Sequence, residues 1–320
     1  MRLARAGARG ALRARLGPWV LPGEVLLRAP GGRPPFVTEH LRGIFGREDL
    51  ELAVRIGPPR PNRKPVVQVL TPDGDLLAFA KLGWNELTRI LVRSEAAALE
   101  EVARGRPRTF VAPRVLHSGE WRELEVILLS PLPADVLRGD PLRQAPPVAA
   151  TEEIAALSEP ETAVLGASAY WQRVEERVAA AGTAALAEAA DRVRGAYGRV
   201  RLTFASWHGD WSPWNMAHGR GRLAVWDWER SARGVPVGLD AAHFDLQLAL
   251  AKRGHDVERA LAAVVAGEAP LLSALSARDL ARLLLALDLL ELALRHAEGG
   301  GEGMDVTVGA YVRALRRCLP

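Results

Sequence analysis

Residues 208–215 read HGDWSPWN, and residues 226–229 read WDWE. Asn215 lies five residues after Asp210, and Asp227 lies twelve residues after Asn215. A carboxylate such as Asp210 can accept the proton of an attacking hydroxyl. Magnesium prefers oxygen ligands and usually takes only one or two protein carboxylates, so Asn215 and Asp227 are adequate ligands. These residue types at this spacing favour transfer of a phosphoryl group from a nucleotide.

The two motifs, in this order, resemble those of the aminoglycoside- and choline-kinase-like phosphotransferases, small-molecule relatives of the protein kinases. The resemblance implies a two-lobed α+β fold, with a five-stranded antiparallel sheet and one helix in the N-terminal lobe and a mainly helical C-terminal lobe. It implies that Asp210 is the catalytic base and that Asn215 and Asp227 bind Mg²⁺. It also implies that His208 is structural and that Asp240 anchors the catalytic loop. The expected co-substrate is ATP or GTP, and the expected acceptor is a small-molecule hydroxyl.

The same resemblance makes Lys81 the lysine that binds the nucleotide phosphates, with Glu95 as its partner. Lys81 follows the apolar run 77–80, which predicts a strand. Glu95 lies four residues from both Leu91 and Leu99, on the apolar stripe of a predicted helix. A carboxylate on a buried stripe requires a cation, so the position of Glu95 supports the pair.

Two further residues are candidates for contact with the nucleotide base. Alternation along a strand places Phe79 on the same face as Lys81. Phe79 can therefore pack against the base, although filling the core of the lobe is an equally good interpretation. Segment 128–133, which includes Leu129, is the expected hinge, whose backbone would meet the purine.

The loop over residues 57–65 departs from the resemblance, because it contains four prolines. Prolines have no backbone N–H, so this loop cannot bind phosphate as a glycine-rich turn does. Asn62 can donate from its side chain, and Arg60, Arg63 and Lys64 can supply charge. A stiff exposed turn is an equally good interpretation. The departure leaves an alternative function open, a weak or inactive pseudokinase or a nucleotide-binding interaction module.

The pattern of apolar residues predicts three parts. Residues 1–35 are expected to be a loosely ordered basic extension, residues 36–131 the nucleotide-binding lobe, and residues 132–320 the catalytic and acceptor-binding lobe. In the first lobe the predicted strands cover residues 49–57, 65–70, 75–82, 111–117 and 123–129, with a turn at Ser118-Gly119 and a helix over 86–103. In the second lobe the predicted helices cover 152–158, 168–181 and 184–197, with a further set over 239–319.

Composition narrows the class of protein. The chain has 320 residues, of which 48% are hydrophobic and 25% charged, as in an ordinary globular protein. One cysteine excludes an internal disulfide and fits a reducing compartment, so a cytoplasmic location is expected. The net charge of +4 comes without a recognisable nucleic-acid module, so nucleic acid is not an expected partner. Segment 280–294 is apolar but interrupted by charges, which predicts a buried amphipathic helix and not a membrane span.

The sequence does not decide which acceptor is used. Trp211 is the aromatic residue that we expect to face it. A polycationic acceptor such as an aminoglycoside would require an acidic pocket in the helical lobe. The candidate acids for such a pocket are Asp245, Asp288, Glu291, Glu298, Glu302 and Asp305.

Overall fold

The computed structural model describes residues 37–55, 62–133, 140, 142, 145–218, 222–276, 278–300 and 304–320, without the side chains of residues 55, 278 and 279. The described chain forms two compact units. The first unit comprises residues 37–55, 63–92 and 115–131, and the second comprises residues 62, 93–114 and those after 131. The expected basic extension and loop residues 57–61 lie outside the described residues.

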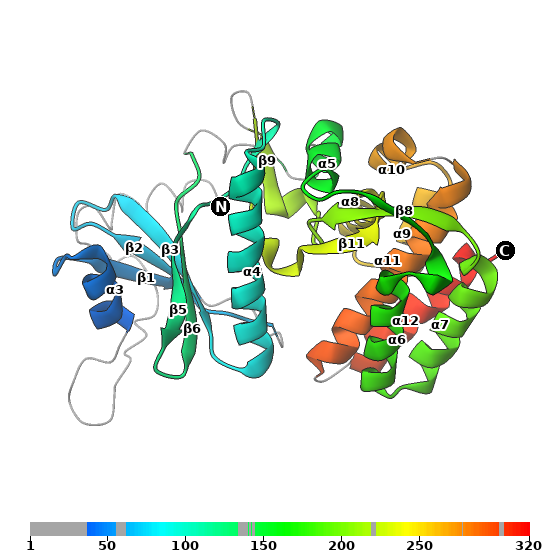
Figure 1. Cartoon of the computed structure of the whole chain (residues 1–320), viewed down its shortest axis with the longest axis horizontal. Coiled ribbons are helices and arrows are strands. Elements are labelled where there is room, and N and C mark those ends of the chain that lie inside the picture. The colour runs from blue at the N-terminus through cyan, green and yellow to red at the C-terminus, as the bar shows by residue number, and fades with distance from the viewer. Residues whose placement is uncertain are drawn as a thin grey trace. The chain divides into compact units, whose positions relative to one another are not determined.

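The first unit is built on a five-stranded antiparallel sheet in the order β1-β2-β3-β6-β5 (Figure 1). Its strands are β1 (Glu51–Arg55), β2 (Val66–Leu70), β3 (Leu76–Gly83), β5 (Val115–Trp121) and β6 (Leu124–Leu129). Burial alternates along β2 and along most of β3, which produces one apolar face. The predicted five-stranded sheet is therefore confirmed.

Two details of the first unit differ from the prediction. Residues Ser118 and Gly119 lie inside β5, and the chain turns instead at Arg122-Glu123, where Arg122 has φ 55°. The prediction of a single helix was also wrong, because α3 (Val37–Phe45) packs against the sheet with Val37 and Leu41 in its core. The apolar residues of α3 recur at helical spacing, and that spacing is the signal for a helix that the sequence offers.

Helix α4 (Glu86–Gly105) contains the boundary between the units, which falls after Val92. Its first turn is capped by Asn85, whose side-chain oxygen accepts a hydrogen bond from the backbone N–H of Thr88 at 2.8 Å. This N-cap explains why the helix begins where the sequence predicts.

The second unit contains two small sheets. One has the order β11-β8-β7, with strands β7 (Glu161–Val164), β8 (Arg201–Trp207) and β11 (Ala232–Pro236). The other has the order β4-β10-β9, with strands β4 (Phe110–Val111), β9 (Met216–His218) and β10 (Leu223–Val225). The predicted strand over 111–117 would make Val111 part of β5. Instead, Phe110 and Val111 form a separate strand.

Helices supply most of the second unit (Figure 1). They are α5 (Val148–Ala155), α6 (Ala169–Ala181), α7 (Ala184–Tyr197), α8 (Leu239–Lys252), α9 (Val257–Val265), α10 (Pro270–Leu275), α11 (Arg278–Gly299) and α12 (Met304–Leu315). Short 3₁₀ turns cover Leu165–Ala167, Pro213–Asn215, Trp228–Arg230 and Arg316–Cys318. Helix α5 begins four residues earlier than predicted, since Pro147 occupies its N-cap position.

Helix α11 is the central helix of this unit and packs against α8 and α12. Its residues from Leu283 to Leu294 are all buried, which confirms the predicted buried helix. Among the described residues, no single helix is long and apolar enough to cross a membrane. The segments 257–275 and 280–299, which are bent relative to each other, reach the length and hydropathy of a membrane span only when they are taken together.

Candidate active site

The predicted catalytic loop, residues 208–215, begins where β8 ends, and α8 holds it in place. Both side-chain oxygens of Asp240, in the first turn of α8, accept backbone hydrogen bonds from the loop. The N–H of His208 donates at 2.7 Å and the N–H of Gly209 at 3.0 Å. Burial raises the pKa of Asp240 to about 6 even though these two donors favour its charged form. Asp240 therefore anchors the loop, as the sequence predicts.

His208 is a structural residue of this loop. It is fully buried, and its Nδ1 accepts a hydrogen bond from the backbone N–H of Asp210 at 3.2 Å. Its Nε2 lies 3.2 Å from the carbonyl oxygen of Trp226, so Nε2 carries the proton and donates. Burial lowers the pKa of His208 to about 4, which keeps the imidazole neutral. The ring thus links the catalytic loop to the segment that contains Asp227.

Asp210 is held by two side chains at once. The Asn215 Nδ2 donates to the Asp210 Oδ2 at 2.8 Å, and the His243 Nε2 lies 3.3 Å from the Asp210 Oδ1. Burial would raise the pKa of Asp210, but the hydrogen bond and the charge of His243 lower it to about 2. About a third of the Asp210 side chain remains exposed. The carboxylate is therefore ionised, fixed in orientation and open to a second reactant.

His243 was not foreseen, and it lies between two carboxylates. Its Nδ1 is 2.8 Å from the Asp288 Oδ1 in α11, and its side chain is 1% exposed. Burial alone would lower its pKa, but Asp288 and Asp210 outweigh that effect and raise the pKa to about 9. Because ionised carboxylates only accept hydrogen bonds, both ring nitrogens carry protons. Asp210 therefore faces a buried imidazolium.

Asn215 and Asp227 lie at the same end of the β9–β10 hairpin. Asn215 directly precedes β9, and Asp227 follows β10 by two residues. The N–H of Trp226 donates to the carbonyl oxygen of Asn215 at 3.0 Å, which closes this end of the hairpin. Asp227 has φ 70°, a left-handed conformation that is rare for residues other than glycine. Such strain is often found at functional sites.

Three carboxylates gather beside this hairpin end. Oxygens of Glu95, Asp227 and Glu229 lie within 4.8 Å of one another, and Glu95 and Glu229 are buried. Carboxylates this close repel each other unless they are protonated or share a cation. The donor set therefore fits a hard divalent cation such as Mg²⁺. Glu229 was not among the predicted ligands, although it is the last residue of the WDWE motif.

The remaining predicted nucleotide residues belong to different parts of the chain. Phe79 and Leu129 are register partners on β3 and β6, and Lys81 lies two residues beyond Phe79 on β3. The burial pattern of β3 puts Phe79 and Lys81 on one face and Ala78 and Ala80 on the other. These residues belong to the first unit.

The predicted pair of Lys81 and Glu95 stays a prediction, because Glu95 belongs to the second unit and Lys81 to the first. Asn62 lies in a turn, is partly exposed and also groups with the second unit. Its contact with a nucleotide is likewise an expectation.

One expectation about the acceptor was wrong. Trp211 is fully buried, and its Nε1 donates to the Thr151 Oγ1 at 2.9 Å, so it cannot face an acceptor. Trp214, three residues later, is 39% exposed. A tryptophan with a buried hydrogen-bond partner has a packing role, which the sequence alone cannot distinguish from substrate contact.

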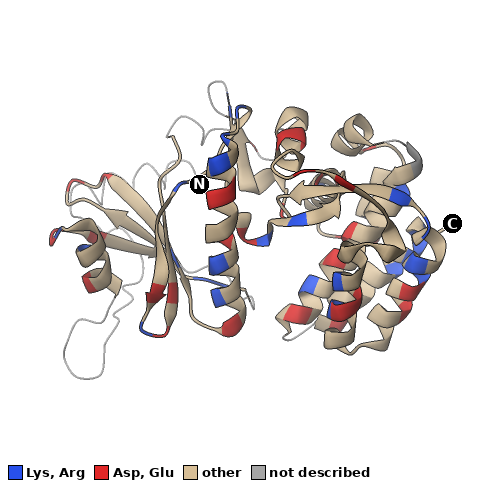
Figure 2. Cartoon of the chain, in the orientation of Figure 1, with Lys and Arg blue, Asp and Glu red and all other residues tan. Residues whose placement is uncertain are grey.

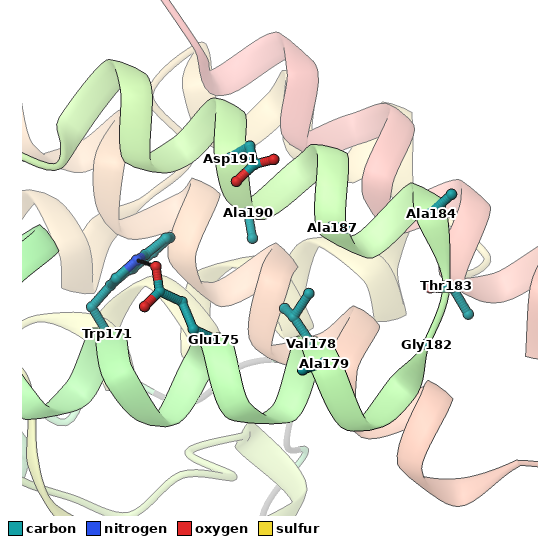
Figure 3. Close-up of a pocket in the computed structure, with 10 residues that line it drawn as sticks. All are labelled: Trp171, Glu175, Val178, Ala179, Gly182, Thr183, Ala184, Ala187, Ala190 and Asp191. Atoms are coloured by element: carbon teal, nitrogen blue, oxygen red, sulfur yellow. Dashed lines mark hydrogen bonds between the residues drawn. The ribbon is translucent and has the colours of Figure 1, made fainter.

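A separate hollow of about 480 Å³ lies between α6 and α7 (Figure 3). Trp171 and Glu175 border it, and the Trp171 Nε1 donates to the Glu175 Oε1 at 2.8 Å. None of the residues that line this hollow belongs to the catalytic loop or to the carboxylate cluster, so it is not the candidate active site.

No protein-family model and no curated protein matches the sequence. Solved structures do match in fold. An APH(2'')-IIa complex with streptomycin and ATP aligns over 90% of this chain and 97% of its own, with TM-score 0.54 and 11% identity. A choline/ethanolamine kinase family protein from Mesorhizobium loti aligns over 98% and 93%, with TM-score 0.51 and 16% identity.

A third solved structure is a thermostable mutant of aminoglycoside phosphotransferase APH(4)-Ia. It aligns over 88% of this chain and 99% of its own, with TM-score 0.53 and 16% identity. Likeness at this level of identity concerns the fold. The chain therefore has the protein-kinase-like fold of the small-molecule phosphotransferases.

Proposed function

We propose that this protein is a kinase that transfers the γ-phosphoryl group of ATP or GTP to the hydroxyl of a small molecule. The observation that carries the proposal is the state of Asp210, which is ionised, oriented by Asn215 and His243, and still accessible. A base for this reaction requires these three properties together. The matched structures with bound nucleotide, among them the complex with streptomycin and ATP, support the nucleotide as co-substrate.

In the proposed reaction the acceptor oxygen forms a bond to the γ-phosphorus while the bond from that phosphorus to the β–γ bridging oxygen breaks. The acceptor proton passes to the exposed part of the Asp210 carboxylate. Asn215 and His243 fix the two carboxylate oxygens, so little reorganisation is needed when the hydroxyl arrives. Asp240 and His208 keep the loop in the geometry that this transfer requires.

Asp227 and Asn215 would hold Mg²⁺, with Glu229 as a further carboxylate beside Asp227. The Asn215 amide nitrogen already donates to Asp210, so its amide oxygen is the atom that remains for a cation. When bound, the cation would neutralise the charge on the β- and γ-phosphates. Lys81 would contribute a further positive charge to these phosphates, with Glu95 as its partner, and Phe79, Leu129 and Asn62 would contact the nucleotide.

A two-step experiment tests the proposed function. Thermal unfolding is first measured with and without Mg·ATP and Mg·GTP, and ADP or GDP release is then followed across a panel of hydroxyl acceptors. We expect a raised melting temperature and acceptor-dependent release of nucleoside diphosphate. Stabilisation by nucleotide without turnover on any acceptor would favour the alternative, an inactive pseudokinase or nucleotide-binding module.

A further inference from the structure

Of the six acids that could receive a cationic acceptor, four are occupied inside the second unit, Asp305 is exposed on α12, and Glu302 lies outside the described residues. Asp288 pairs with His243 and is fully buried. Asp245 accepts hydrogen bonds from the backbone N–H groups of Leu271 and Leu272 at 3.4 and 2.8 Å. These two acids are therefore structural and do not form the wall of an acidic pocket.

Glu291 and Glu298 are neutralised by one arginine. The Arg177 Nη1 lies 2.6 Å from the Glu291 Oε2, and the Arg177 Nε lies 2.5 Å from the Glu298 Oε1. The Tyr170 hydroxyl also donates to Glu291 at 3.1 Å. Figure 2 shows basic and acidic segments interspersed on α6, α7 and α11, without a block of acids. Glu291 and Glu298 are therefore already bound and do not offer a free carboxylate to an amino group of an acceptor.

Arginines, in contrast, lie against the catalytic loop itself. The Arg295 Nη1 donates to the carbonyl oxygen of Gly209 at 2.6 Å, directly beside Asp210. The Arg295 guanidinium carbon lies 5.2 Å from the ring centroid of Trp207, and this cation–π contact helps to hold the guanidinium in place. Burial and His243 dominate the pKa of Asp210, and the charge of Arg295 adds to the lowering. Arg295 is thus close enough for its charge to act on the base.

The backbone of Arg230 also lies against Gly209. A Cβ atom built on Gly209 would lie 2.2 Å from the Arg230 carbonyl oxygen and 3.0 Å from the Arg230 Cβ, so the two backbones touch. Arg230 is mostly buried, yet its guanidinium makes no hydrogen bond or ion pair with any residue of the described chain. Burial lowers the pKa of Arg230, and the charge of Arg295 lowers it further.

A guanidinium without a protein partner keeps its donors available for an anion, and a second guanidinium nearby adds to the attraction for negative charge. Glu229 and Glu298 contribute negative charge at longer range. The Glu298 carboxylate is already bound by Arg177, and Glu229 belongs to the carboxylate cluster. The five donors of a guanidinium suit a carboxylate or a phosphate group, which can accept two parallel hydrogen bonds.

We propose that Arg230 and Arg295 bind the anionic group, a carboxylate or a phosphate, of an acceptor that also carries the attacking hydroxyl. This inference rests on the proposed kinase function and names its substrate class, hydroxylated small anions. Both arginines lie against Gly209, the residue directly before Asp210, so one small molecule bound by them can also reach the base.

Binding measured by calorimetry without nucleotide tests the inference separately from turnover. D-Gluconate is compared with the neutral D-glucitol, and D-glucose 6-phosphate with D-glucose, so that each pair differs in its anionic group. We expect at least one anion to bind tenfold or more tightly than its neutral partner. The two pairs together show whether a carboxylate or a phosphate is preferred.

Two substitutions locate the effect. Arg230→Gln is expected to abolish the preference for the anion, and Arg230→Lys to retain part of it. Arg233→Gln, at an exposed arginine paired with Glu101, should leave the preference unchanged. Equal affinity within both pairs, no binding of any of the four compounds, or an undiminished preference in Arg230→Gln would overturn the inference.

The same variants separate the acceptor from the nucleotide as the source of the anion. If Arg230→Gln raises the KM for ATP more than the KM for an anionic acceptor, the guanidinium serves the nucleotide and the inference fails. Turnover on neutral or cationic acceptors, with none on anionic acceptors, would also contradict the inference but would leave the proposed kinase function intact. Anion binding by the wild-type protein without turnover on any acceptor would instead contradict the proposed function.

Discussion

Asp210 receives its properties from residues that are distant in sequence, 33 positions away in the case of His243. Replacing Asp210 with Asn keeps the size and the hydrogen-bonding shape but removes the proton acceptor. We expect turnover to fall by about 10²- to 10⁴-fold, the usual contribution of a general base, with nucleotide affinity changed less than threefold. Acceptor-dependent ADP release and nucleotide titration measure the two quantities. The exposed Asp191→Asn on α7 serves as control, and near-normal turnover in Asp210→Asn would exclude the base assignment.

His243 makes the stability of the protein depend on pH. Its folded pKa of about 9 lies above the ordinary histidine value of 6.5, so folding is favoured by the bound proton. This contribution is complete below pH 6.5 and is lost as the pH rises towards 9. In His243→Gln the loss of thermal stability between pH 6.5 and 9 should be smaller than in the wild type. Melting temperatures at pH 6, 7.5 and 9 test this, with exposed His218→Gln as control. Parallel pH profiles for His243→Gln and wild type would contradict it.

At the scale of elements, the site depends on how β8, the catalytic loop and α8 join. Gly209 has φ 84°, and a Cβ atom there would lie 2.2 Å from the Arg230 carbonyl oxygen. Gly209→Ala should therefore lower the free energy of unfolding by about 3 kcal/mol or more, through strain and the displaced Arg230 backbone. Gly182, at the end of α6, has φ 64° with open space around it. Gly182→Ala should cost only about 1 kcal/mol. If denaturant unfolding gave equal losses of unfolding free energy for Gly209→Ala and Gly182→Ala, the close approach of the Arg230 backbone to Gly209 would be unimportant.

Elements with a strong local pattern were predictable, and those fixed by distant contacts were not. Helix α4 has both an apolar stripe and an N-cap residue, Asn85, so its start was predicted correctly. The β5–β6 turn was misplaced because no glycine marks it, and Arg122 adopts the positive φ instead. Strand β4 has two residues and exists because it pairs with β10, more than 100 positions later. No local pattern can show such a pairing.

At the scale of the whole molecule, the motif residues were the part of the site that the sequence could supply. Asp210, Asn215 and Asp227 stand close together along the chain, so their types and spacing were informative. From α11, Asp288 contacts His243 on α8, 45 positions away, and Arg295 contacts Gly209 in the loop, 86 positions away. They lie in a helix whose sequence indicates burial alone. Their roles become visible only when folding brings α11 against the catalytic loop.

The proposed function requires that the protein bind a magnesium nucleotide, with Lys81 and Asp227 as the proposed contacts. The most direct measurement is the Kd for Mg·ATP, obtained by calorimetry for Lys81→Met, Asp227→Asn and the exposed control Lys252→Met. Each of the first two changes removes a charged contact with the nucleotide or its cation. We therefore predict Kd values at least tenfold above wild type for both, and an unchanged Kd for the control. A wild-type Kd for Mg·ATP in both single variants, Lys81→Met and Asp227→Asn, would contradict the account.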